Sequence, residues 1–253
     1  MFAEERLNKI LELLKTEGKV LVKDLSIKFN VSEPMIRKDL QKLEKEGQIK
    51  RTYGGAILKR NLAETTNISN RMIKNLELKK MIAHKAFNLI NENEVIFLDI
   101  SSINFILAEI IAQNNKNITI LTNMVEITAY FRNNSNTNII CIGGTYSKNL
   151  GGVVGSAAIE SISKYRADKA FIGSCGVNLS DCSISNFDLE EGNTKKTIIN
   201  CSKSIYLLME NEKFYFDGAY KFAHLKDINT IITEENPNSK ICEILNKNRV
   251  DLL

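Results

Sequence analysis

Hydrophobic residues recur at helical spacing from the start of the chain. Leu7, Ile10, Leu11 and Leu14 occupy positions i, i+3, i+4 and i+7, which places them on one face of a helix. This pattern predicts an amphipathic helix over residues 3–16, and the glycine that follows at position 18 suits its C-terminal cap.

The same periodicity predicts two more helices, over residues 22–29 and 33–46, with a tight turn between them. Ser32 is a favourable N-cap for the later helix. Pro34 falls in its first turn, where the missing N–H costs nothing. Three short helices in this order, with a tight turn before the third, are typical of a helix-turn-helix.

A short strand is expected over residues 48–51, a turn at 53–55 and a return strand over 56–58. A two-stranded ribbon directly after the third helix is a wing. We therefore predict a winged helix-turn-helix over residues 1–58.

The third helix has an apolar face and a polar face. Ile36, Leu40 and Leu43 are spaced for burial, and the opposite face carries basic and amide groups that can reach base edges in a major groove. From this helix and the wing we expect contacts to DNA from Ser32, Glu33, Met35, Arg37, Lys38, Gln41, Lys50, Arg51 and Tyr53. The alternative for this helix alone is an ordinary amphipathic surface helix.

Net charge supports the DNA-binding interpretation. Residues 1–60 hold 14 Lys and Arg against 9 Asp and Glu, whereas residues 61–253 hold 20 against 21. The whole positive excess therefore lies in the first quarter of the chain, and basic charge concentrated in a small module is what binding to a phosphate backbone needs.

From residue 74 onward, helical and strand-like segments alternate. Strands are expected at 95–99, 118–122, 139–142, 169–173, 205–209 and 230–233, and helices at 76–91, 103–113, 125–132, 156–165 and 188–201. This alternation predicts an α/β domain over residues 74–253 with a mostly parallel sheet covered on both faces. Residues 59–73 are polar and without a clear period, so we expect a connector there.

Ligands of parallel sheets bind beyond the carboxyl ends of the strands, where this chain carries small, hydroxyl and charged residues. We expect a small-molecule effector to contact Asp99, Ser101, Ser102, Thr122, Asn123, Gly143, Gly144, Cys175, Gly176, Glu190, Lys195 and Lys213.

Other classes of protein find little support in the composition. The five cysteines and two histidines have no metal-ligand spacing, so we expect reduced thiols, no metal and no cofactor. No apolar run is long enough to span a membrane, and the first fifteen residues lack a signal-peptide core. We therefore expect a cytoplasmic protein.

Specific motifs resemble the DeoR family of transcriptional regulators. In the first part they are Val31–Glu33, Ile36–Leu40, Leu43–Glu44, Gly47 and Arg51–Ala56. In the second part they are Phe97–Asp99, Leu121–Asn123, Ile142–Gly144, Ala167–Gly176 and Lys213–Phe214. The resemblance implies a repressor with a sensor domain related in fold to ribose-5-phosphate isomerase and CoA transferases. It also implies an operator DNA, a phosphorylated sugar as effector, and no catalytic residues. Because one module reads few bases, we expect a homodimer or homotetramer.

Two segments depart from the family pattern. Ile100–Asn104 lacks the glycine and a threonine of the usual loop, and Glu210–Glu212 places two carboxylates before Lys213. Both changes argue against tight phosphate binding there. Two alternatives therefore stay open: a sugar-phosphate isomerase fused to a DNA-binding module, with Asp99, Glu190 or Glu191, and Lys195 as acid–base groups, or a scaffold with a vestigial sensor.

Overall fold

The computed structural model describes residues 2–63, 67–133 and 136–253, which form two compact units. The first unit holds the chain up to Asn61 together with Asn238–Glu243. The second holds Leu62–Pro237 together with Ile244–Leu253. Each unit has its own cluster of buried apolar side chains, which is what an independent domain needs.

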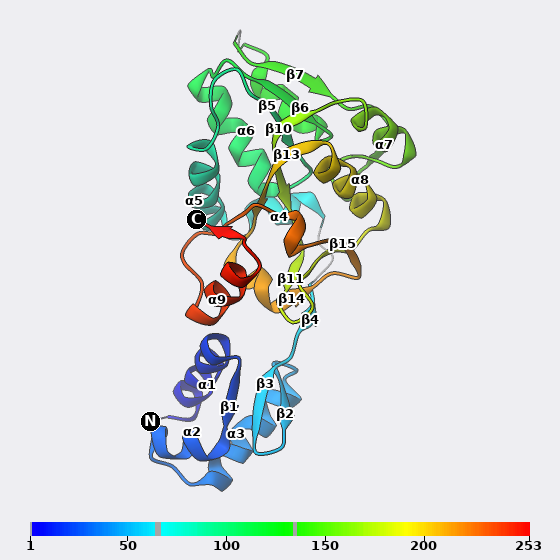
Figure 1. Cartoon of the computed structure of the whole chain (residues 1–253). Coiled ribbons are helices and arrows are strands. Elements are labelled where there is room, and N and C mark those ends of the chain that lie inside the picture. Colours follow the sequence, from blue (N-terminus) through cyan, green and yellow to red (C-terminus); the bar gives the residue numbers. More distant parts are fainter. Residues whose placement is uncertain (1, 64–66, 134–135) are drawn as a thin grey trace. The chain divides into compact units, whose positions relative to one another are not determined.

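The first unit is a winged helix (Figure 1). Its helices are α1 (Ala3–Glu17), α2 (Val22–Phe29) and α3 (Glu33–Lys45). Its antiparallel sheet has the order β1 (Lys19–Leu21), β3 (Gly55–Leu58), β2 (Ile49–Thr52). The three predicted helices and the wing are confirmed, and no end differs from the prediction by more than one residue.

Strand β1 was not predicted, because three residues with one buried side chain, Val20, give no readable alternation. It exists because its backbone pairs with β3. The glycines of the wing make that pairing possible. Gly54 has a φ of 76°, and a Cβ on Gly55 would overlap the carbonyl oxygen of Val20.

The second unit is built on a seven-stranded parallel sheet (Figure 1). In spatial order its strands are β17 (Asp251–Leu252), β16 (Thr230–Ile232), β13 (Ser202–Leu208), β10 (Ala167–Gly173), β5 (Val95–Leu98), β6 (Thr119–Thr122) and β7 (Asn138–Cys141). Every neighbouring pair is parallel, as the sequence predicted.

Helices α5 and α6 cover one face of this sheet, and α7 and α8 lie on the other (Figure 1). The helices after the winged helix are α4 (Ile68–Ile73), α5 (Leu76–Phe87), α6 (Ser102–Asn114), α7 (Ser156–Ile162), α8 (Leu189–Asn200) and α9 (Ser239–Lys247). Three segments are 3₁₀ helices, namely η1 (Val125–Phe131), η2 (Asn211–Tyr215) and η3 (Leu225–Asp227). The α-helix expected over 125–132 is therefore a 3₁₀ helix.

The connector expected over residues 59–73 is in part ordered structure. It contains β4 (Asn61–Leu62) and helix α4, while residues 64–66 lie outside the described residues. Helix α4 forms because the Asn67 side chain accepts a hydrogen bond from the Asn70 N–H (3.0 Å), and Ile68 is buried in the core of the second unit.

Further short strands complete the second unit and were not predicted. One sheet has the order β11 (Gly176–Asn178), β12 (Ser183–Asn186), β15 (Tyr220–His224), and two pairs join β8 (Thr145–Ser147) with β9 (Gly152–Val154) and β4 with β14 (Phe216–Asp217). These strands are too short to show a clear alternation, and some of them are polar in composition. Strand β12 reads Ser-Ile-Ser-Asn, and yet all four residues are buried.

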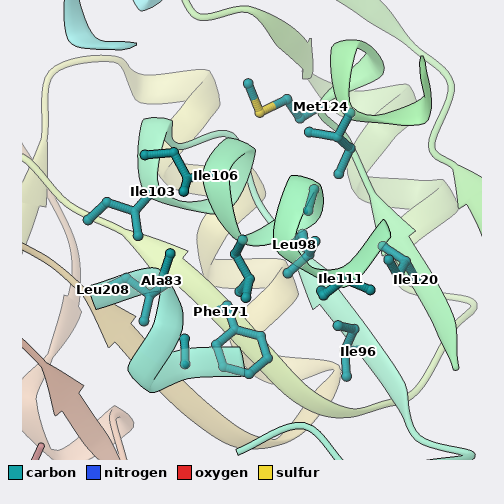
Figure 2. Close-up of a cluster of buried hydrophobic side chains, with 14 of the residues drawn as sticks. Ala83, Ile96, Leu98, Ile103, Ile106, Ile111, Ile120, Met124, Phe171 and Leu208 are labelled. Atoms are coloured by element: carbon teal, nitrogen blue, oxygen red, sulfur yellow. The ribbon is translucent and has the colours of Figure 1, made fainter. Parts of the chain in front are cut away.

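Apolar side chains from the sheet and from α5 and α6 form the core of the second unit. Figure 2 shows Leu98 and Ile120 of the sheet beside Ile106 and Ile111 of α6, with Phe171 of β10 below them. This core holds the strand ends in fixed positions. Across the described ranges, no helix is both long and apolar enough to cross a membrane.

Candidate nucleic-acid interface and effector site

Helix α3 presents the exposed face that the sequence predicted. Ile36, Leu40 and Leu43 are at most 1% exposed, whereas Arg37, Lys38 and Gln41 point to solvent. Pro34, Met35 and Lys45 are exposed as well. The residues expected to meet bases therefore share one accessible face of a helix whose other face is held by the core.

The beginning of α3 has two features that suit a phosphate contact. Ser32 is the N-cap, but among the described residues its hydroxyl makes no capping hydrogen bond to the helix. Glu33 pairs with Arg37 at 3.0 Å, and both side chains are about half exposed. The ion pair holds Arg37 along the helix.

Asp39 was not singled out from the sequence. It lies on the buried side of α3 and accepts two hydrogen bonds from Arg6 of α1, at 2.5 and 3.0 Å. Both side chains are at most 10% exposed. This forked ion pair fixes α3 against α1, and its carboxylate holds the pKa of Arg6 above the ordinary value.

The wing carries the other expected DNA contacts. Tyr53 is fully exposed at its tip, and Lys50 is also exposed. Arg51 has a partner inside the unit: Glu44 of α3 accepts a hydrogen bond from its N–H at 3.0 Å and lies 3.8 Å from its guanidinium. Arg51 therefore ties the wing to α3 as well as facing solvent.

At the strand ends of the second unit, Asp99 is the centre of a buried polar cluster. Its carboxylate accepts hydrogen bonds from Asn104 (2.7 Å), from the Gly173 N–H (3.2 Å) and from Lys195 of α8. Lys195 also pairs with Glu191 at 3.3 Å. The structure thus brings Asp99 and Lys195 together, as expected, but it places them inside the protein.

Burial and pairing oppose each other in this cluster. Burial raises the pKa of Asp99, although Lys195 and the Gly173 N–H stabilise its charge. Burial also opposes the charge of Lys195, but Asp99 and Glu191 together outweigh it and hold the pKa of the ammonium above its usual value. Lys195 is 2% exposed and faces two carboxylates, so its charge serves to hold Asp99 and Glu191 in place inside the protein.

The loop at 100–104 is closed by its own side chains. Ser101 caps α6 by accepting from the Asn104 N–H at 3.1 Å, and its φ of −155° is ordinary extended backbone. The loop therefore needs no glycine at this position. The close approach occurs instead at Gly173, where a Cβ would lie 2.8 Å from that of Ser101. Ile103 and Asn104 are buried, so the loop has become part of the core.

Most other expected effector residues also have structural roles. The Thr122 hydroxyl donates to the Leu98 carbonyl (2.8 Å) and accepts from the Met124 N–H. A Cβ on Gly144 or Gly176 would overlap neighbouring atoms, and Gly143 and Glu190 are exposed. Ser102 is buried near the start of α6.

Asn123 and Ser174 differ from these residues, because each has a buried oxygen that forms no hydrogen bond with any described residue. The Asn123 amide donates to the Val153 carbonyl (2.9 Å), but its Oδ1 has no donor among the described residues, and the same holds for the Ser174 hydroxyl. Both residues follow carboxyl ends of central strands, β6 and β10. Both unpaired oxygens are buried at the edge of the sheet where ligands of parallel sheets commonly bind.

A second charged group lies around helix α4. We define the α4 cluster by its members, which come from α4, from α5 and from the segment after β13: Arg71, Lys74, Lys79, Glu210, Glu212 and Lys213. Of these the sequence analysis selected Lys213 alone. Arg71 was missed because its segment was interpreted as a connector, although Asn67 as an N-cap is a readable helix start.

Comparison with known proteins agrees with these two units. Residues 6–61 match the model of the DeoR-like helix-turn-helix domain, and residues 74–235 match that of the DeoR C terminal sensor domain. The chain belongs to the DeoR family. The expected family, fold class and function as a DNA-binding transcriptional regulator are thereby confirmed.

Two curated DeoR relatives are similar over nearly their whole length. The HTH-type transcriptional repressor GlcR of Bacillus subtilis (strain 168) is 31% identical over 253 residues, which are 100% of this chain and 96% of GlcR. The glycerol-3-phosphate regulon repressor of Escherichia coli (strain K12) is 29% identical over 248 residues, which are 98% of this chain and 97% of the repressor.

Among solved structures, ribose 5-phosphate isomerase A of Methanocaldococcus jannaschii is similar over 55% of each chain, with a TM-score of 0.41 and 14% identity. A likeness this low supports no argument about activity. The individual contacts of this DeoR regulator with DNA and with an effector remain predictions.

Proposed function

We propose that this protein represses an operon of carbohydrate metabolism and releases its operator when a phosphorylated sugar binds the second unit. The observation that carries the proposal is the exposed basic and amide face of α3 beside the wing. Support comes from the relatives, because one of them is named as the repressor of a glycerol-3-phosphate regulon.

The DNA-binding part is tested with DNA from upstream of the protein's own gene and of its neighbours. We expect fluorescence anisotropy to detect specific binding that Gln41→Ala and Lys38→Ala weaken by about ten-fold or more, since a good base contact contributes about 1–3 kcal/mol. Lys9→Ala, which removes an exposed charge from α1, is the matched control. Equal losses in all three variants would indicate general charge attraction and contradict the proposed interface.

The effector part is tested by adding single sugar phosphates, and the corresponding free sugars, to the protein–operator complex. We expect at least one phosphorylated sugar to release the operator and its unphosphorylated form to have no effect. Release by neither form would refute sugar-phosphate control and leave operator binding intact as a separate result.

We propose further that the second unit senses its ligand without converting it. Lys195 and Asp99, which an isomerase interpretation would use for proton transfer, are buried and paired with each other. Incubation of sugar phosphates with the protein, followed by NMR, is therefore expected to show no turnover.

We also propose that the regulator acts as a homodimer or homotetramer on paired half-sites.

A further inference from the structure

The α4 cluster carries more positive than negative charge. It contains four cationic side chains, Arg71, Lys74, Lys79 and Lys213, and two carboxylates, Glu210 and Glu212. Contacts join them into one group: Lys79 donates to the Arg71 carbonyl and pairs with Glu210 at 3.8 Å, and the Lys213 N–H donates to the Glu210 carbonyl at 2.9 Å.

Both carboxylates are already neutralised by lysines. Glu210 is 5% exposed and faces Lys79, which is also buried. Glu212 lies 3.2 Å from Lys74 and 3.8 Å from Lys213. Within the six residues of the α4 cluster, lysines offset the repulsion of a phosphate that the Glu210–Glu212 segment implies, and four cations against two carboxylates leave a positive excess.

Arg71 has an unused donor inside this cluster. One terminal nitrogen donates to the Leu150 carbonyl at 3.1 Å, but its Nε is buried and has no acceptor in the described part of the chain. A guanidinium presents five donors in a fixed fork, and a buried donor without an acceptor is costly. An oxyanion that binds two donors of the fork removes this cost.

Cys175 connects this cluster to the strand ends. Burial and the nearby Glu191 raise the pKa of its thiol, while Lys213, Arg71 and Lys195 act in the opposite direction. Charges from both the α4 cluster and the Asp99 cluster therefore reach the same half-buried side chain. Cys175 follows Ser174, whose buried hydroxyl has no partner among the described residues. The cationic group thus acts on a residue that directly follows an unpaired hydroxyl in the chain.

We propose that Arg71 and Lys213 hold the anionic group of the effector, so that helix α4 is the element that detects it. The inference rests on the proposed sensing function and replaces the closed loop at 100–104 as the phosphate site.

The position of α4 in the chain makes this site suitable for regulation. It is the first helix after the winged helix, and it has six residues, too few for much stability of its own. Its order depends on the burial of Ile68 and on the Arg71 bond to Leu150. An anion held by Arg71 adds a further restraint at the point where the chain enters the second unit.

The test uses inorganic phosphate as the probe and the full-length protein. We expect phosphate to raise the Tm of the wild type relative to KCl of equal ionic strength, because a ligand that binds only the native state stabilises it. Arg71→Gln is expected to need at least ten-fold more phosphate for the same shift, and Arg71→Lys to recover part of the response. The matched control is Lys164→Gln, which removes an exposed cation from the segment after α7.

A wild type whose Tm responds to phosphate no more than to KCl would overturn the inference, as would equal responses of Arg71→Gln and wild type. Circular dichroism and the Tm without phosphate show whether Arg71→Gln folds. If Arg71→Gln does not fold, the phosphate response of Arg71→Lys, which keeps the charge, decides the outcome.

Operator release separates this proposal from the proposed function. If a sugar phosphate releases the operator from Arg71→Gln at the wild-type concentration, the site is wrong but sensing stands. If no sugar phosphate releases the wild type, the sensing function itself fails.

Discussion

Asp39 illustrates how one buried charge orients a DNA-binding helix. It lies among Ile36, Leu40 and Leu43 on the inner side of α3, where an unpaired carboxylate would be costly. Arg6 supplies both hydrogen bonds that the carboxylate needs. The pair therefore sets the rotation of α3 about its axis and, with it, which residues face outward.

We expect Asp39→Ala to lower the free energy of unfolding of the first unit by about 3 kcal/mol, because it leaves the Arg6 guanidinium buried without a partner. Urea denaturation followed by circular dichroism measures the change. Glu12→Ala, which removes an exposed acidic residue from α1, is the control and should change stability by less than about 0.5 kcal/mol. A loss for Asp39→Ala no larger than the control's would show that the pair contributes nothing to stability.

At the level of single residues, the sequence predicted which polar residues gather near the strand ends better than which of them pair. Asp99, directly after strand β5, does meet Lys195, which lies on helix α8. That Asp99 and Lys195 form a buried ion pair with each other could not be predicted. The partners of Asp99 are Asn104, Gly173 and Lys195, and the last two lie more than 70 positions away in the chain.

Among the secondary-structure elements, α3 is the one whose local chemistry bears most directly on function. Ser32 occupies its N-cap, yet the hydroxyl makes no capping bond within the described chain. An N-cap serine normally stabilises a helix by about 1 kcal/mol through such a bond. The hydroxyl of Ser32 is instead free to donate to a phosphate.

Ser32→Ala should therefore change the free energy of unfolding by less than about 0.5 kcal/mol, well below the usual cost of losing a cap. The Kd for the operator should rise by about three- to ten-fold, which corresponds to the roughly 0.5–1.5 kcal/mol of one typical hydrogen bond. Chemical denaturation and anisotropy titrations measure the two quantities, with Ser163→Ala, an exposed serine of the second unit, as control. The opposite result, a loss of about 1 kcal/mol with unchanged affinity, would identify the hydroxyl as a cap.

The elements that were predicted correctly are those with a strong period of their own. Helix α2 has the expected bounds, and the central strands β5, β6 and β10 were found from short apolar runs. Strands β1 and β12 and helix α4 were not, because tertiary pairing and burial of a few residues stabilise them. Missing α4 also meant missing Arg71.

In the whole molecule, charge and chemistry are divided between the two units. The excess of basic residues lies in the winged helix, where it supports binding to the DNA backbone. The anion site that we infer lies in the second unit, around Arg71. Control of one by the other requires a coupling free energy between two separate sites, and such coupling acts equally in both directions.

This reciprocity gives a quantitative prediction. If the releasing sugar phosphate weakens operator binding by some factor, operator DNA must weaken binding of that sugar phosphate by the same factor. Couplings of about 1–3 kcal/mol correspond to roughly 5- to 150-fold. Calorimetric titration of the sugar phosphate into the free protein and into the protein–operator complex gives one factor, and anisotropy titrations of operator with and without it give the other.

Agreement of the two factors is expected for the wild type, and Arg71→Gln should weaken sugar-phosphate binding in both titrations while leaving operator affinity in its absence unchanged. Lys164→Gln should reproduce the wild-type factors. Equality of the two factors follows from linkage for any route of coupling, so the variant decides the route. If Arg71→Gln keeps the wild-type sugar-phosphate affinity and the wild-type coupling factor, coupling through α4 is wrong, because an element that responds to the ligand must lose that response when its contact to the ligand is removed.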